Sequence, residues 1–84
     1  MQCEEIKRLV AQAIPGGEVE VTGDGYHFEV RVVSDVFAGK TPVQKQKIIY
    51  APLNEFIKSG ALHALSIKAY TPAEWESAKR LRVQ

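Results

Sequence analysis

Hydrophobic side chains near the start of the chain follow first a helical and then a strand-like period. Five of them recur with helical spacing on one face: Ile6, Leu9, Val10, Ala13 and Ile14. Pro15 ends the helix that this spacing predicts. Residues 18–22 and 27–32 then alternate apolar with polar side chains, as half-buried strands do. Because the glycine-rich segment 23–25 favours a tight turn, we expect these strands to form an antiparallel hairpin with one wet face.

A second helix is predicted over residues 42–59. Its apolar side chains again share one face: Val43, Ile49, Leu53, Phe56 and Ile57. Pro52 lies inside this span and lacks the backbone N–H that would bond the carbonyl of Ile48, so we expect a kink or break near residues 50–51. Gly60 is placed to cap the end of this helix.

The last part of the chain predicts one more strand and one more helix. Residues 65–69 alternate in hydrophobicity and indicate a third strand. Thr71 and Glu74 directly after it have the spacing of a capping box, which marks a helix start. We expect Trp75 and Ala78 to face inward from this helix.

The order of elements, α-β-β-α-β-α, predicts an α/β (α+β) fold with a three-stranded mixed sheet. A helix between the second and third strands implies a right-handed crossover that leaves these strands parallel, with the helices packed on one sheet face. We expect residues 1–84 to form a single domain. His27 opens the second strand and His63 precedes the third, so both belong to the same end of the sheet. Because neighbouring strands lie about 4.8 Å apart, the two imidazoles could approach one metal or ligand.

Composition narrows the class of protein. With 45% hydrophobic and 25% charged residues the chain resembles an ordinary soluble globular protein, and its formal net charge of +1 gives no whole-molecule argument for nucleic acid or acidic membranes. The single cysteine, Cys3, cannot form an internal disulfide, which favours a reducing compartment. No run approaches about 18 apolar residues and the start does not read as a signal peptide. We therefore expect a cytoplasmic protein that does not span a membrane.

One segment is recognisable. Residues 63–75, with the sequence His-Ala-Leu-Ser-Ile-Lys-Ala-Tyr-Thr-Pro-Ala-Glu-Trp, resemble the C-terminal part of BolA proteins. The resemblance extends to segments 23–28 and 37–40 in the same order, and is strongest to the short YrbA/IbaG-type members. It implies a KH-like fold, in agreement with the architecture predicted from periodicity.

The resemblance also implies a function. BolA proteins are non-enzymatic partners of monothiol glutaredoxins in iron–sulfur or iron homeostasis, redox signalling and stress response. The two proteins form a heterodimer around a shared [2Fe-2S] cluster, to which glutaredoxin contributes its cysteine and bound glutathione. His63 corresponds to the family's C-terminal histidine ligand, and His27 is the residue that matches the place of a second ligand. The isolated protein is then expected to hold no cofactor and to be a monomer or weak homodimer.

Each candidate residue has a plainer structural interpretation as well. His63 could cap the carbonyls left free after the second helix, and His27 could be an exposed residue on the wet face beside Glu29. Cys3 lies near a helix start, where the dipole can activate a thiol, but we favour the plainer interpretation of an unremarkable terminal thiol.

The alternative function is a KH-like nucleic-acid-binding transcriptional regulator. Lys40, Lys45 and Lys47 form a positive segment that could neutralise phosphates. The chain lacks the Gly-x-x-Gly loop with which KH domains clamp nucleic acid. It also has Lys-Gln-Lys at 45–47, where many BolA proteins carry a histidine. An enzyme is disfavoured, because the sequence has no nucleophile motif and no phosphate-binding loop.

Overall fold

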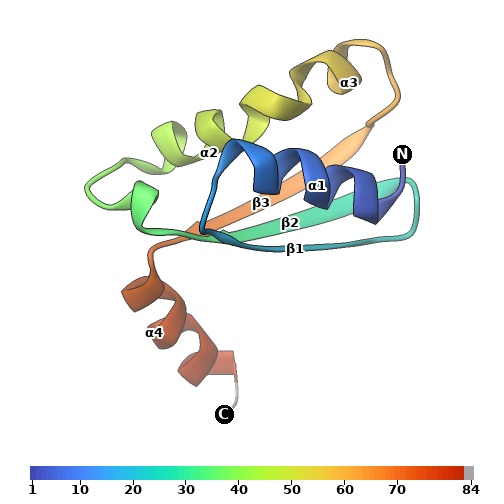
Figure 1. Ribbon diagram of the computed structural model, residues 1–84. Coiled ribbons are helices and arrows are strands. Elements are labelled where there is room, and N and C mark those ends of the chain that lie inside the picture. The colour runs from blue at the N-terminus through green and yellow to red at the C-terminus, as the bar shows by residue number, and fades with distance from the viewer. Residues whose placement is uncertain (83–84) are drawn as a thin grey trace.

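The computed structural model describes residues 1–82 (Figure 1). Its helices and strands follow the predicted order, with two short 3-10 turns added. Their bounds are α1 Cys3–Ala13, β1 Glu18–Gly23, β2 His27–Val33, η1 Asp35–Phe37, α2 Pro42–Tyr50, η2 Ala51–Leu53, α3 Asn54–Lys58, β3 Ala64–Tyr70 and α4 Pro72–Arg82.

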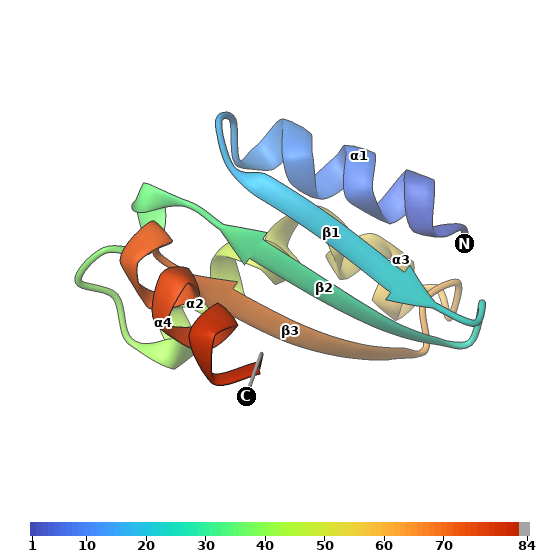
Figure 2. The same ribbon diagram turned by 90° about the horizontal axis from the view of Figure 1, so that it is seen from below.

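The sheet has the predicted mixed topology. Its strand order is β1-β2-β3, with β1 antiparallel and β3 parallel to the central strand β2. In the parallel pair, His27 lies beside Ala64 and Val33 lies beside Tyr70. Both histidines therefore belong to the end of the sheet where β2 and β3 begin, as the sequence predicts. The N-terminus of α1 lies at this end too (Figures 1 and 2).

The hydrophobic core lies between one face of the sheet and the helices α1, α2 and α3. Fully or nearly fully buried side chains from both layers form it: Ile6, Val10, Ile14, Phe28, Val30, Val32, Phe37, Ile49, Leu53 and Leu62. The prediction for the second helix was partly wrong, because Val43 is 60% exposed and Ile57 36% exposed. Neither side chain is among those that form the core or pack against it.

Pro52 interrupts the predicted second helix as expected. α2 ends at Tyr50, a 3-10 turn occupies Ala51–Leu53, and α3 resumes at Asn54. Pro52 has no backbone N–H to donate, and it lies in the 3-10 turn, where the α-helical hydrogen-bonding pattern is interrupted. The apolar face continues through the break, since Leu53 is fully buried. Gly60 follows with a φ of +81°, as a helix-ending glycine should.

The last helix corrects one prediction. α4 does not join the other helices on one sheet face but lies on the opposite side of the sheet (Figures 1 and 2). There the Trp75 ring lies 4.1 Å from the guanidinium carbon of Arg31 and 5.3 Å from the Tyr70 ring. Arg31 alternates with the core residues Val30 and Val32, so its side chain leaves the outer face. Trp75 thus packs on the sheet, but on the face that periodicity marked as wet.

None of the helices within residues 1–82 is long and apolar enough to cross a membrane.

Candidate metal centre

A tight turn fixes the backbone around the first candidate histidine. Oδ1 of Asp24 accepts hydrogen bonds from the backbone N–H of Tyr26 at 2.9 Å and of His27 at 2.8 Å. These two bonds hold the pKa of the Asp24 carboxyl below its usual range, since they stabilise the charged form. Gly25 adopts a φ of +93°, which favours glycine. A Cβ on Gly23 would lie 2.5 Å from the carbonyl oxygen of His27, so a side chain there would disrupt the turn.

Tyr26 lies between the two histidines. Its ring is stacked on the His63 imidazole, with centroids 5.2 Å apart and planes at 16°. Its contact with the His27 imidazole is edge-on, at 5.3 Å and 60°. His27 also approaches Asp24, with 3.9 Å between Nδ1 and Oδ2. All four side chains are exposed to solvent.

The register explains why His63 contacts Tyr26. His27 is paired with Ala64, so the preceding residues, Tyr26 and His63, lie next to each other where the strands begin. The two histidines therefore share an end of the sheet, as expected, and the ring of each contacts Tyr26. That both imidazoles approach one metal stays a prediction.

The described part of the chain brings few metal ligands together. Within residues 1–82, no group of three or more His, Cys, Asp or Glu side chains is close enough to hold a metal ion. A [2Fe-2S] cluster takes four protein or cofactor ligands. An exposed imidazole on the rim of the domain fits a cluster whose other ligands come from a second molecule.

Cys3 is the first residue of α1, at the same end of the sheet. Its side chain is partly buried and packs against the hydrophobic core. That packing favours the plain interpretation of Cys3 as a helix-start residue.

The three candidate phosphate-binding lysines lie elsewhere. Lys40 and Lys47 are exposed, whereas Nζ of Lys45 bonds Oε1 of Glu74 at 2.9 Å and its side chain is only 13% exposed. The positive segment therefore has one of its charges already paired. No local sequence pattern indicates this ion pair, because its members lie 29 residues apart.

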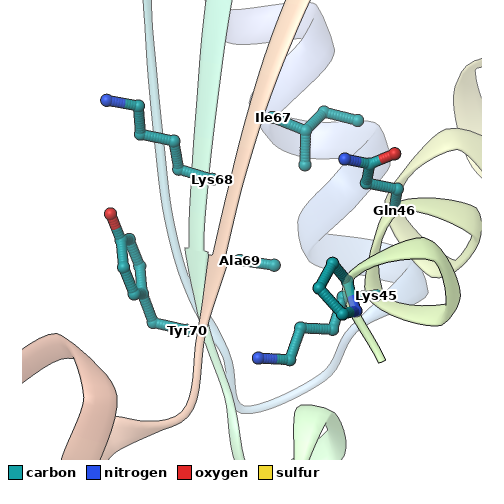
Figure 3. Close-up of a pocket in the computed structure, with 7 residues that line it drawn as sticks. Lys45, Gln46, Ile67, Lys68, Ala69 and Tyr70 are labelled. Atoms are coloured by element: carbon teal, nitrogen blue, oxygen red, sulfur yellow. The ribbon is translucent and has the colours of Figure 1, made fainter. Parts of the chain in front are cut away.

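A groove of about 300 Å³ runs between α2 and the second half of β3 (Figure 3). Lys45 and Gln46 line it from α2, and Ile67 and Ala69 from β3, while Lys68 and Tyr70 extend to the other side of the strand. Since β3 rises about 3.3 Å per residue, the groove near Tyr70 lies roughly 20 Å from His63. It is not part of the histidine site.

Comparison with known proteins agrees with this architecture. Residues 7–74 match the family model described as BolA-like protein. The acid stress protein IbaG of Escherichia coli K12 is 46% identical over 81 residues, which cover 96% of each chain. Among solved structures, a BolA homologue from Coxiella burnetii aligns with a TM-score of 0.78 at 34% identity, covering 90% of this chain and 97% of that one. The BolA domain of SufE1 from Arabidopsis thaliana aligns with a TM-score of 0.74 at 38% identity, covering 86% and 93%. This chain belongs to the BolA family.

Proposed function

We propose that this protein is a non-enzymatic partner of a monothiol glutaredoxin, and that the two share a [2Fe-2S] cluster to which His63 is a ligand. The observation that carries the proposal is the placement of His63: an exposed imidazole at a sheet end, held against Tyr26. Family membership supports the choice of partner.

A rim imidazole suits a shared ligand for physical reasons. It reaches solvent without opening the core, so a second protein can cover it and supply the sulfur ligands. Replacing a thiolate by histidine on one iron raises the reduction potential of such a cluster. The chemistry that the cluster supplies when bound is one-electron redox chemistry. The protein's own part is to present an imidazole at a fixed place.

Histidine ligation also ties the complex to pH. A histidine must be neutral to bind metal, so acid competes with the iron for its lone pair. The Escherichia coli relative is named as an acid stress protein. We propose that this protein's complex also responds to acid stress. Its cluster is then lost or rearranged when the cell interior acidifies.

The experiment is reconstitution. The purified protein is mixed with a monothiol glutaredoxin, glutathione, ferrous iron and sulfide, and the product is examined by native mass spectrometry and visible circular dichroism. We expect a one-to-one heterodimer carrying one [2Fe-2S] cluster, with a spectrum distinct from that of the glutaredoxin homodimer. A mixture that yields only the homodimer spectrum and free BolA-type protein would contradict the proposal.

A further inference from the structure

We infer that Tyr26 is a positioning residue for His63, fixing the plane of its imidazole so that the ring edge faces the partner. The inference rests on the proposed function, because it specifies how the proposed ligand is held. It starts from an unusual placement: Tyr26 is 60% exposed, yet its ring is stacked on the His63 imidazole at 5.2 Å and 16°.

The backbone of Tyr26 is fixed before its side chain is considered. Its N–H donates to Asp24 in the turn, and Gly25 supplies the positive φ that the turn requires. On the following residue, His27 meets the Tyr26 ring edge-on at 5.3 Å. The tyrosine ring is therefore held between its own turn and two imidazoles, although solvent reaches most of it.

Stacking leaves the ligand atoms of His63 free. The lone pair of an imidazole nitrogen lies in the plane of the ring, and a stacked neighbour covers a face of the ring, not its edge. Tyr26 thus limits rotation of the imidazole without covering the nitrogens. An exposed side chain that is already restrained loses less conformational freedom when a partner binds it. Aromatic pairs of this kind contribute enough to change an affinity by about three- to tenfold.

The test compares Tyr26→Leu with the conservative variant Tyr26→Phe. Leucine keeps an apolar side chain and removes the aromatic ring, whereas phenylalanine keeps the ring and removes only the hydroxyl. Because Tyr26 is exposed, both variants should give the wild-type far-ultraviolet circular dichroism. In the free protein, nuclear magnetic resonance reports the stack directly, since the tyrosine ring current displaces the resonances of the His63 ring protons.

We expect Tyr26→Leu to move the His63 ring resonances toward those of an unstacked histidine and to weaken the cluster-bearing complex with glutaredoxin about three- to tenfold. Tyr26→Phe should retain the wild-type resonances and an affinity within about twofold of the wild type. A Tyr26→Leu protein whose affinity and cluster spectrum equal those of the wild type would overturn the inference and leave the proposed function intact. A wild-type protein that forms no cluster-bearing complex would overturn the proposed function itself.

Discussion

The two ends of the sheet are built in different ways. At the end where β2 and β3 begin, the side chains of Asp24, Tyr26, His27 and His63 are exposed and joined by ring contacts and a turn; we call this the open end. At the other end α4 is held against the outer face; we call this the latched end. Its contacts are those of Trp75 with Arg31 and Tyr70, and of Lys45 with Glu74.

The difference separates the contacts that stabilise the fold from the candidate ligand. The latched end combines a cation–π contact, an ion pair and helix caps, whereas the candidate ligand lies at the open end, where a substitution removes little buried surface. A partner can therefore cover the open end without competing with the protein's own packing. Substitutions at the latched end should therefore lower the stability of the fold. Substitutions at the open end should impair cluster formation and leave stability nearly unchanged.

The largest effect on stability is expected from the core beside the latched end. Phe37, in η1, is fully buried, so Phe37→Ala should lower the free energy of unfolding by about 3–5 kcal/mol. Urea denaturation followed by circular dichroism measures this. His63→Ala serves as the open-end control and should unfold at nearly the wild-type urea concentration. Equal losses in the two variants would remove the distinction between the ends.

Trp75→Ala should have a smaller effect. The sequence alone suggests a core tryptophan, whose loss would largely unfold so small a domain, but the ring lies half-buried on the outer face. We expect a loss of about 1–2 kcal/mol from its contacts with Arg31 and Tyr70. The urea midpoint measures the change, and Leu81→Ala, at a side chain 73% exposed, is the matched control in the same helix. A loss as large as that of Phe37→Ala would show that α4 is part of the main core.

The latched end should also loosen in acid. Hydrogen bonds from the Thr71 backbone and from Lys45 hold the pKa of Glu74 below its usual range. A depressed folded-state pKa gives stability that is complete above the unfolded-state value of about 4.3 and is lost as the pH falls through the lower, folded-state pKa. Thermal unfolding between pH 6 and pH 3 measures this loss.

In Glu74→Gln the residue no longer carries a charge that acid can remove. The stability of this variant should therefore change less with pH than that of the wild type below about pH 4.3. Glu4→Gln, at an exposed first-turn position of α1, is the control. Parallel curves for wild type and Glu74→Gln would show that the charged Glu74 carboxylate, with its bonds to Thr71 and Lys45, does not add to stability.

The smallest expected effect is the binding of nucleic acid by the positive segment. With Lys45 paired to Glu74, the exposed charges of the positive segment are Lys40 and Lys47. Few phosphate contacts give weak, salt-sensitive binding, so we expect no gel shift of duplex DNA at micromolar protein and 150 mM salt. A shift that weakens steeply with salt and is lost in a Lys40→Ala, Lys47→Ala double variant would favour the alternative function.

Much of the fold could be predicted from the sequence. The capping box of Thr71 and Glu74 forms as expected, with the Thr71 N–H donating to Glu74 at 2.8 Å and the Glu74 N–H donating to Oγ1 of Thr71 at 3.2 Å. Hydrophobic alternation identified Phe28 and Val30 as core residues. These features depend on residues close together in the sequence, so local patterns suffice to predict them.

What could not be predicted depends on long-range geometry. Trp75 is apolar enough for either face of the sheet, and only the path of the chain after β3 places it over Arg31. For the open end, the sequence predicted that His27 and His63 share a sheet end, but not that Tyr26 stacks on His63. That contact depends on a register of β2 and β3 that places Tyr26 rather than His27 beside His63.

The most direct measurement of the central claim is the visible circular dichroism of the reconstituted glutaredoxin complex for wild type, His63→Ala and Cys3→Ser. All three proteins should fold, because His63 is exposed and serine is nearly isosteric with Cys3. We expect His63→Ala to lose or markedly alter the cluster bands and Cys3→Ser to retain them; His27→Ala should give an intermediate change if it is also a ligand. A folded His63→Ala protein that gives the wild-type cluster spectrum with the same glutaredoxin would contradict the proposed ligation.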